Sequence, residues 1–332
     1  MTMNLISQQA GGRIMSSLQN SPNPPKEKRR LPSRVVSRAK SAGPAGIAWL
    51  NSLEDTIAHL ERQWRVTIGE ALEGGSHAFV APAEGAQGEQ FAVKIDMPES
   101  MGGDFQHGME MLRRMNGRGY VKLYEYDPQH QACLMERLGK PINQLEMSVE
   151  EQIRAICPLL LLTWDHPIPP QEISKGNECV EWFQQFLPTM WQRLGRPCSQ
   201  RVMSLTEVYL ADRMVQADPN RFVLLHGDAH GGNTLETLTG DGYKFIDPDG
   251  IYNEPAYDLG VVMREWPEDY AVAPLDKGKE RCALLSQLTG VAEDAIWAWG
   301  FLQTVSTGFV LLQVGQEHTG RAMLQAAEAW AD

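Results

Sequence analysis

The pattern of apolar and polar positions divides the chain into a strand-rich first part and a helix-rich second part. Leu53, Ile57 and Leu60 recur at three- and four-residue spacing, which predicts a helix near the start of the first part. Short apolar runs bounded by glycine-bearing turns follow it, and these predict strands. The elements expected in this part are helices at about 50–64 and 105–115 and strands at 65–71, 79–83, 90–96, 121–126 and 132–136.

Beyond Pro141 the pattern is mainly helical. Ser148 and Glu151 stand three residues apart before an apolar stretch, which is the capping-box signature of a helix that reaches about Trp164. Pro158 is expected to kink or split that helix. A short hairpin with its turn at 239–242 interrupts the helical pattern. The further helices are expected at about 178–194, 204–217, 259–264, 275–288, 292–314 and 320–330.

Residues 1–44 show no sustained apolar periodicity and are rich in Ser, Gln, Asn and Pro. They hold eight Lys or Arg residues against one acid, Glu27. This composition favours a disordered extension; an organelle-targeting peptide or a start placed too far upstream are the alternatives. We therefore expect a tail at 1–44, a first lobe at 45–139 and a second lobe at 140–332.

The composition, with 42% hydrophobic and 22% charged residues, is that of a soluble globular protein. Residues 45–332 hold 22 basic and 41 acidic residues, which disfavours nucleic acid and favours cationic small molecules as ligands. The longest apolar run, 155–164, is far shorter than the roughly 20 residues that a membrane span needs. Five dispersed cysteines favour reduced thiols in the cytoplasm and disfavour structural zinc. We expect a cytoplasmic protein, and the sequence predicts no membrane or protein partner.

The densest group of polar residues lies between an apolar run and the predicted hairpin. His226, Asp228, His230 and Asn233 share one loop, and Asp247 follows the return strand. Phosphoryl transfer needs a carboxylate that takes the acceptor's proton and oxygen ligands that hold Mg²⁺ on the phosphates of ATP. An Asp, an Asn five residues later and an Asp after a hairpin form the arrangement found in kinases. The pattern indicates phosphoryl transfer, with a purely structural polar turn as the alternative.

Lys94 lies inside an apolar strand of the first lobe, where a charge must be paired or solvated. In a kinase such a lysine holds the ATP phosphates and pairs with a Glu on the following helix, for which Glu110 is the candidate. The alternative is a solvated lysine on an edge strand. The turn Gly74, Gly75 and Ser76 could lay backbone amides on phosphate, although it has no GxGxxG pattern.

The segment after the fifth predicted strand, MERLG at 135–139, changes from apolar strand to charged loop. A kinase hinge at this position would offer backbone groups to adenine. Glu136 and Leu138 are therefore candidate nucleotide-binding positions.

Gly227 precedes Asp228 where protein kinases usually carry Arg, and the pattern His-Gly-Asp-x-His-x-x-Asn resembles that of aminoglycoside phosphotransferase-like kinases. The stretches 116–123 (NGRGYVKL) and 247–260 (DPDGIYNEPAYDLG) narrow the resemblance to the aminoglycoside 6-phosphotransferase/hydroxyurea kinase family, which includes streptomycin 6-kinases. The similarity runs from about residue 46 to near the C-terminus. It implies an α+β, two-lobed protein-kinase-like fold, with a small antiparallel-sheet N-lobe plus one helix and a larger, mainly helical C-lobe.

The resemblance also implies the site. Asp228 is expected to be the general base, Asn233 and Asp247 the Mg²⁺ ligands, and Lys94 the residue on the ATP phosphates, oriented by Glu110.

Three further residues are expected to support the site. By position in the motif, His226 braces the loop through hydrogen bonds and Asp258 anchors it. His230 is either structural or directed at the substrate.

The acceptor is expected to be a small, cationic, hydroxyl-bearing molecule, with streptomycin-type aminoglycosides as the first choice. The acidic residues considered for its binding surface are Glu254, Glu265, Glu268 and Asp269. Two alternatives remain, namely a kinase of an ordinary metabolite and a pseudokinase that binds nucleotide and acts as an interaction module. A protein kinase is disfavoured because no Ala-Pro-Glu segment follows Asp247.

Overall fold

The strand-forming runs of the first part pair into one five-stranded antiparallel sheet in the computed structural model, which describes residues 29–73, 75, 77–98, 105–167 and 176–332. The strand order is β1-β2-β3-β5-β4, and each neighbouring pair is antiparallel. The strands are β1 (Val66–Ile68), β2 (Ala78–Gly85), β3 (Gln90–Asp96), β4 (Leu123–Asp127) and β5 (Ala132–Glu136).

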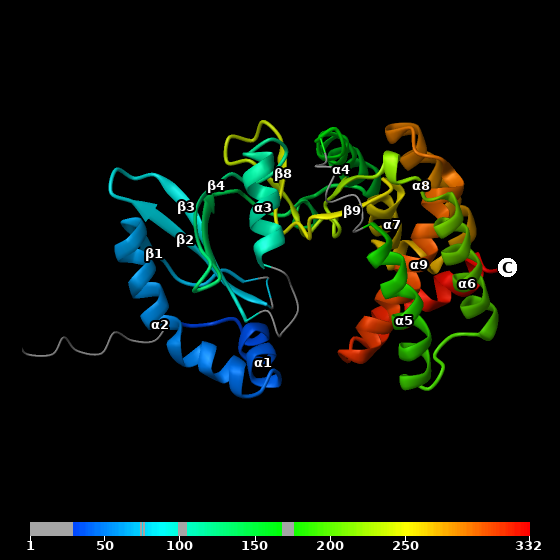
Figure 1. The fold of residues 1–332 in the computed structure, drawn as a ribbon, viewed down its shortest axis with the longest axis horizontal. Coiled ribbons are helices and arrows are strands. Elements are labelled where there is room, and N and C mark those ends of the chain that lie inside the picture. The colour runs from blue at the N-terminus through cyan, green and yellow to red at the C-terminus, as the bar shows by residue number, and fades with distance from the viewer. Residues whose placement is uncertain (1–28, 74, 76, 99–104, 168–175) are drawn as a thin grey trace, which may run out of the picture.

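The two faces of this sheet are covered by different helices. Val93 and Ile95 of β3 pack in one core with α2 (Pro44–Trp64), the helix that the spacing of Leu53, Ile57 and Leu60 predicted. On β5, Cys133 and Met135 belong to another core, together with α3 (Phe105–Met115). Because side chains alternate along a strand, Lys94 and Asp96 are directed toward the α3 face, which is the side turned to the rest of the molecule (Figure 1).

The sequence predicted a disordered tail through residue 44, but residues 29–44 are folded. Helix α1 (Ser33–Ser41) packs against α2 and buries Val35 and Ala39. The helices approach closely at Gly46, where a Cβ would lie 2.0 Å from the Ala39 carbonyl oxygen. The guanidinium of Arg29 donates to Glu54 at 2.7 Å and to the Ile68 carbonyl at 2.9 Å. The prediction was wrong for this segment because two buried positions are too few to show periodicity.

The described residues of the second lobe form seven α-helices with bounds close to those expected. The Ser148 hydroxyl and the Glu151 side chain form the predicted capping box at the start of α4, and Pro158 lies inside that unsplit helix. The helices are α4 (Val149–Trp164), α5 (Gly176–Arg193), α6 (Gln200–Gln216), α7 (Ala256–Arg264), α8 (Pro274–Thr289), α9 (Glu293–Gln313) and α10 (Glu317–Trp330). The described 3₁₀ turns in this lobe are η2 (Ile142–Gln144), η4 (Pro219–Arg221) and η5 (Pro267–Ala271).

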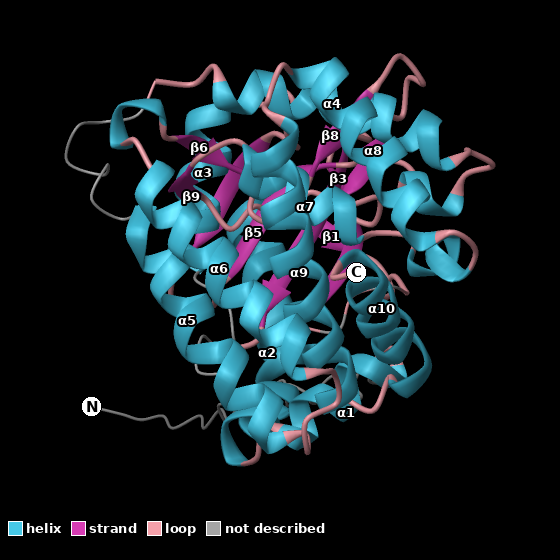
Figure 2. Ribbon diagram, turned by 90° about the vertical axis from the view of Figure 1, so that its right-hand side faces the viewer, coloured by secondary structure: helices cyan, strands magenta, loops and turns pink. Residues whose placement is uncertain are grey.

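Helix α9 is long and apolar enough to cross a membrane by length and composition. Most of it is nevertheless buried in the second lobe, where Trp299, Phe301 and Phe309 are fully inaccessible. Viewed from that lobe, α9 lies among the other helices, in front of the strands of the first lobe (Figure 2). Its apolar character is that of a central core helix.

Two short antiparallel strand pairs lie between the lobes (Figure 1), and the polar loop at 226–233 connects one pair to the other. Strand β6 (Val223–Leu225) pairs with β9 (Ile251–Asn253), and β7 (Thr234–Glu236) pairs with β8 (Tyr243–Phe245) in the predicted hairpin. The segment between the lobes pairs with β7, since the Gly139 amide donates to the Glu236 carbonyl at 2.8 Å. The hairpin therefore connects the segment between the lobes to the polar loop at 226–233.

Helices α7 and α9 approach each other closely at two glycines. This close packing fixes the position of α7 next to the polar loop at 226–233. A Cβ at Gly260 would lie 2.7 Å from the Trp299 carbonyl carbon, and one at Gly300 would lie 2.8 Å from Met263 Cβ. We expect Gly260→Ala to lower the free energy of unfolding by about 1–3 kcal/mol, because overpacking outweighs the gain in helix propensity. Urea denaturation measures this change. Gly242→Ala is the matched control, because no atom lies within 4 Å of its Cβ position; an equal loss in both variants would contradict the prediction.

Candidate active site

The loop that follows β6 is anchored by one buried carboxylate. Asp258, in the first turn of α7, accepts hydrogen bonds from the amides of His226 at 3.0 Å and Gly227 at 2.8 Å. It also accepts one from Trp164 Nε1 at 3.0 Å. Burial raises the pKa of Asp258 to about 6, and these three donors work in the opposite direction by stabilising its charge. The loop is thereby tied to α7 and α4.

His226 braces the same loop from inside. Its Nε2 lies 3.0 Å from the Ile246 carbonyl, and its Nδ1 accepts from the Asp228 amide at 3.2 Å. The ring is packed beside Tyr120 and Phe245. Burial lowers the pKa of His226 to about 4, so the imidazole is neutral, with the proton on Nε2.

Asp228 stands between cationic and polar partners. One of its carboxylate oxygens contacts Arg264 of α7, and the other lies 3.4 Å from His230 Nε2. Burial works to raise the pKa of Asp228, but the His230 hydrogen bond and the Arg264 charge outweigh it and hold the pKa well below its ordinary value. The carboxylate is therefore ionised at neutral pH and able to accept a proton.

Asn233 and Asp247 lie beside one another through backbone pairing. The Asn233 amide side chain donates to the Asp228 carbonyl at 3.1 Å, and the Ile246 amide donates to the Asn233 carbonyl at 2.9 Å. Asp247 has a φ of 52°, in the left-handed region that costs energy for most residues. Its side chain is 43% exposed, so the carboxylate is accessible to a ligand.

The residues present fit a magnesium ion. Mg²⁺ takes oxygen ligands and is commonly held by one or two carboxylates together with substrate phosphates. Asp247 supplies an exposed carboxylate, and the Asn233 side chain, which uses its nitrogen to reach Asp228, keeps its oxygen as a ligand. Asn233 and Asp247 are thus the two side chains that would hold the ion.

Lys94, on β3, also lies next to Asp247. Its Nζ lies 2.9 Å from Asp247 and 2.9 Å from Asp96. Burial works to lower the pKa of Lys94, but Asp247 and Asp96 outweigh it and raise the pKa above its ordinary value. The lysine is therefore a fixed positive charge next to the proposed metal position. Sequence reasoning placed Lys94 but missed Asp96, two residues further along the strand.

The structure does not bring Glu110 to Lys94. Glu110 accepts from Arg113 and Arg114 of its own helix, both at 2.9 Å. The expected pairing is wrong in this structure because Gly108, two residues earlier, occupies the position on α3 that approaches the Asp247 loop. A Cβ at Gly108 would lie 3.1 Å from the Pro248 carbonyl oxygen.

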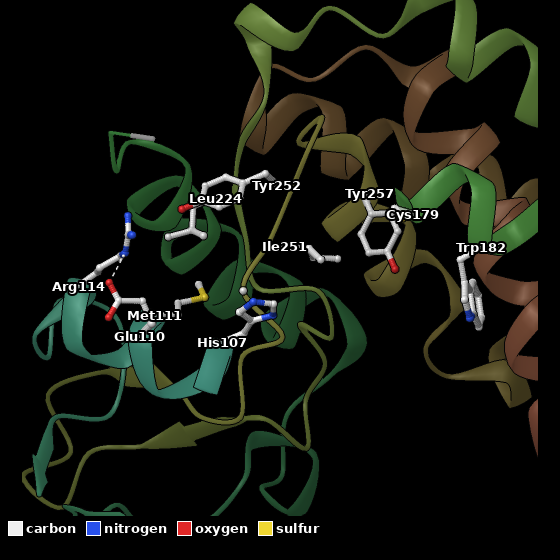
Figure 3. A pocket seen from close by; sticks show the side chains of 11 residues that line it. His107, Glu110, Met111, Arg114, Cys179, Trp182, Leu224, Ile251, Tyr252 and Tyr257 are labelled. Carbon is white, nitrogen blue, oxygen red and sulfur yellow. Dashed lines mark hydrogen bonds and ion pairs between the residues drawn. The ribbon is translucent and has the colours of Figure 1, made fainter. Parts of the chain in front are cut away.

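Glu110 instead lines a pocket of about 320 Å³ between α3 and the second lobe. His107, Met111 and Arg114 of α3 lie along one side of this pocket, and Trp182 and Tyr257 lie across from them (Figure 3). Neither Asp228 nor Lys94 lines this pocket within the part of the chain that the structure describes. Gly250 and Ile251 do line it, so the pocket adjoins the segment that carries Asp247.

The candidate nucleotide-binding positions of the hinge differ from each other. Both carboxylate oxygens of Glu136 bind Lys244 Nζ, at 2.6 and 2.9 Å, and its amide donates to the Lys122 carbonyl. Leu138 is buried, and within the described residues its backbone amide has no recorded hydrogen bond. The backbone amide of Leu138 is therefore available to a ligand, whereas the amide of Glu136 is engaged.

Of the glycine-bearing turn, only Gly75 lies among the described residues, and a Cβ there would meet no atom within 4 Å. The predictions for Gly74 and Ser76 lie outside the described residues. Next to this turn, burial and the charges of Arg38 and Lys94 lower the pKa of His77.

Gly227 is explained by its close approach to Asp249, which lies two residues beyond Asp247. The glycine has a φ of 89°, and a Cβ on it would lie 2.7 Å from Asp249 Cβ. A larger residue before Asp228 would displace Asp249 from the loop. Burial and the nearby Asp228 carboxylate raise the pKa of Asp249 to about 7. The signal was available, since Asp249 shares the DPDG motif with Asp247.

The acidic residues considered for the acceptor surface are mostly occupied in other ways. Glu254 accepts from Trp299 Nε1 at 2.6 Å and pairs with Arg213 at 3.3 Å, so it holds helices together. Asp269 pairs with Arg281 at 3.1 Å. Glu268 is exposed, and Glu265 follows Arg264 at the end of α7. Of the four, Glu265 is the one that adjoins a residue in contact with Asp228.

Comparisons with known proteins agree with this geometry. A family model for aminoglycoside/hydroxyurea antibiotic resistance kinases matches residues 63–315. The streptomycin 6-kinase of Streptomyces glaucescens is 25% identical over 272 residues, which are 81% of this chain and 86% of that protein. The hydroxyurea phosphotransferase of Kitasatospora aureofaciens is 27% identical over 237 residues, which are 69% of this chain and 66% of that protein.

Solved structures show the same fold. The choline kinase LicA from Streptococcus pneumoniae has a TM-score of 0.56 and 17% identity, covering 85% of this chain and 99% of its own. The aminoglycoside phosphotransferase APH(4)-Ia, in a ternary complex with ADP and hygromycin B, has a TM-score of 0.58 and 11% identity, covering 83% and 97%. The two-lobed kinase-like architecture expected from the sequence is confirmed.

Proposed function

The chain belongs to the aminoglycoside/hydroxyurea antibiotic resistance kinase family, and from that premise we propose that it transfers the γ-phosphate of ATP to a hydroxyl of a streptomycin-type aminoglycoside. The observation that carries this proposal is the cluster in which hydrogen bonds join Asp228 to Asn233 and Asn233 to the residue before Asp247. The acceptor is drawn from the curated relatives, two of which are streptomycin 6-kinases.

In the proposed mechanism Asp228 orients the acceptor hydroxyl and takes its proton. The acceptor oxygen forms a bond to the γ-phosphorus, the bond from that phosphorus to the β–γ bridging oxygen breaks, and ADP leaves. The proton ends on the Asp228 carboxylate, which is ionised beforehand because Arg264 and His230 lower its pKa. Lys94 holds the α- and β-phosphates. Mg²⁺, when held by Asn233 and Asp247, would neutralise phosphate charge.

The proposed compartment is the cytoplasm, which supplies ATP. All five cysteines are free thiols in the structure, as a reducing compartment would keep them.

The test is Mg²⁺-dependent ADP release from ATP against a panel of streptomycin, other aminoglycosides, hydroxyurea and common polyol metabolites. Turnover with streptomycin supports the proposed acceptor. Turnover with only a metabolite would retain the mechanism and replace the acceptor. Nucleotide binding without turnover on any acceptor would make the chain a pseudokinase.

The contact between Arg264 and Asp228 predicts the pH dependence of the reaction. Arg264→Gln removes a positive charge that lowers the pKa of Asp228, so that pKa rises. Because the base must be ionised, the acidic limb of the kcat–pH profile is expected to move to higher pH. Arg321→Gln, which removes an exposed arginine paired within α10, is the matched control. An unmoved acidic limb in Arg264→Gln would contradict Asp228 as the titrating base.

A further inference from the structure

The phosphate-binding lysine of this kinase is oriented by a residue other than the expected helix glutamate. Glu110 bonds to the arginines of its own helix. Gly108 of α3, which has no side chain, approaches the Pro248 carbonyl of the Asp-Pro-Asp-Gly loop. Lys94 is nevertheless held at 2.9 Å by each of two carboxylates, from Asp247 and from Asp96.

We propose that Asp96 is the positioning residue for Lys94, in the place that kinases usually give to a glutamate on the helix after this strand. Lys94 and Asp96 stand two residues apart on β3, so both side chains project from the same face of the sheet. This inference rests on the proposed function, since Lys94 needs positioning only if it holds ATP phosphates.

The surroundings of Asp96 suit a fixed partner. Strand β3 is paired on both sides, with Lys94 opposite Val80 of β2 and Cys133 of β5. The Asp96 amide donates to the Gln131 carbonyl at 2.8 Å, which fixes the backbone at the end of the strand. The side chains of Lys94 and Asp96 are each only 18% exposed. A hydrogen-bonded charge pair shielded from water in this way holds a defined geometry.

The two carboxylates around Lys94 differ in what else they do. Asp247 is 43% exposed and is one of the two residues that would hold Mg²⁺. Asp96 has Lys94 as its only ion-pair partner among the described residues. Asp96 is therefore the carboxylate that stays with Lys94 when Asp247 is engaged with the ion.

The arrangement has a consequence for α3. A lysine paired with a helix glutamate is correctly placed only when that helix is in position. A lysine paired within its own strand is placed as soon as the sheet is folded. Changes on α3 should then leave nucleotide affinity unaltered, whereas loss of the Asp96 charge should weaken it.

The experiment compares Asp96→Asn with Glu110→Gln, since each variant removes one carboxylate charge with little change of shape. ATP affinity is measured by calorimetry on the full chain without added metal, and kcat and KM are measured with the acceptor identified by the panel. Asp96→Asn is expected to weaken ATP binding and to lower kcat/KM for ATP by about 10- to 100-fold, which is the range for losing a hydrogen bond to a charged group. The KM for the acceptor should stay within about two-fold of the wild-type value, and Glu110→Gln should match wild type.

A double-mutant cycle separates positioning from a general structural effect. In a Lys94→Met background, Asp96→Asn should cause little further loss of ATP affinity, because the group that Asp96 positions is already gone. A full additional loss would show that Asp96 acts on the fold and would overturn the proposal. If Asp96→Asn is unfolded at the assay temperature, Asp96→Ser replaces it with the same expected result.

Two other results would overturn the proposal. One is ATP affinity and kcat/KM unchanged in Asp96→Asn, and the other is a larger loss in Glu110→Gln than in Asp96→Asn. Failure of the proposed function has a different signature, because wild type would then turn over no acceptor while calorimetry still reports the Asp96 effect on ATP. A wild-type chain that binds no ATP would overturn both.

Discussion

Asp228→Asn is expected to lower kcat by about 10²- to 10⁴-fold, the usual cost of removing a positioned general base. The asparagine keeps the size of the side chain and can still meet Arg264 and His230, so the loop should remain folded. What it loses is the ability to take the acceptor's proton. ATP affinity should change little, because Asp228 is not among the residues proposed to hold the phosphates or the metal.

The measurement is steady-state ADP release at saturating ATP and acceptor, with calorimetry to check ATP affinity. Asp276→Asn, an exposed carboxylate at the start of α8, is the control and should retain wild-type kcat. If Asp228→Asn kept more than about a tenth of wild-type kcat, Asp228 would not be the general base, since the loss would fall below the range for such groups.

Asp258→Ala is expected to cause the largest loss of stability, about 3 kcal/mol or more in the free energy of unfolding. The aspartate accepts from the His226 and Gly227 amides and from Trp164 Nε1 in a fully buried position. Alanine would leave two buried donors and one partly buried donor unpaired, and each buried one costs about 1–3 kcal/mol before relaxation. The catalytic loop should also lose its fixed geometry, so kcat should fall together with stability.

Urea denaturation followed by circular dichroism measures the stability change. Asp55→Asn, on the exposed side of α2, is the control and should stay within about 0.5 kcal/mol of wild type. Asp258→Asn should be intermediate, because its amide oxygen can still accept one or two of the three hydrogen bonds. A loss below about 1 kcal/mol in Asp258→Ala would mean that water or another acceptor replaces the carboxylate.

The local part of the site could be predicted because it is continuous in sequence. Asp228 and Asn233 share one loop, and Asp247 follows through a hairpin whose turn was recognisable. Spacing within a loop and across a short hairpin determines which side chains can meet. The residue types at these spacings were therefore enough to predict phosphoryl transfer. Asp258 was predicted to anchor the loop from its place in the motif, and its hydrogen bonds to His226 and Gly227 are of that kind.

The partners of these residues were not predictable in the same way. Arg264 is 36 residues from Asp228, and they meet because α7 packs against α9 through Gly260 and Gly300. Asp249 takes the space that Gly227 leaves open. In both cases the contact depends on how closely two backbone segments approach each other. A pattern within a short stretch of sequence does not predict that distance.

The carboxylate partner of Lys94 shows most clearly what the sequence alone could not predict. Glu110 and Asp96 are both acidic residues within reach of Lys94 along the sequence, and the choice of Glu110 assumed a particular rotation of α3. Neighbouring residues of a helix point about 100° apart. A difference of one position is therefore enough to direct Glu110 away from Lys94 and toward the arginines of its own helix.

The sequence alone determined the order of most helices and strands and the Asp228–Asn233–Asp247 group, because each depends on periodicity or spacing within short stretches. The two-lobed architecture and the kinase family followed from the resemblance of its motifs to those of a known family. Only the tertiary structure decided that residues 29–44 fold onto α2, that Arg264 meets Asp228, and that Asp96 pairs with Lys94 in place of Glu110. The physical reason is that these contacts are selected by the packing distance and rotation of whole elements. Those quantities emerge from the summed burial of many side chains, so no single stretch of the chain encodes them.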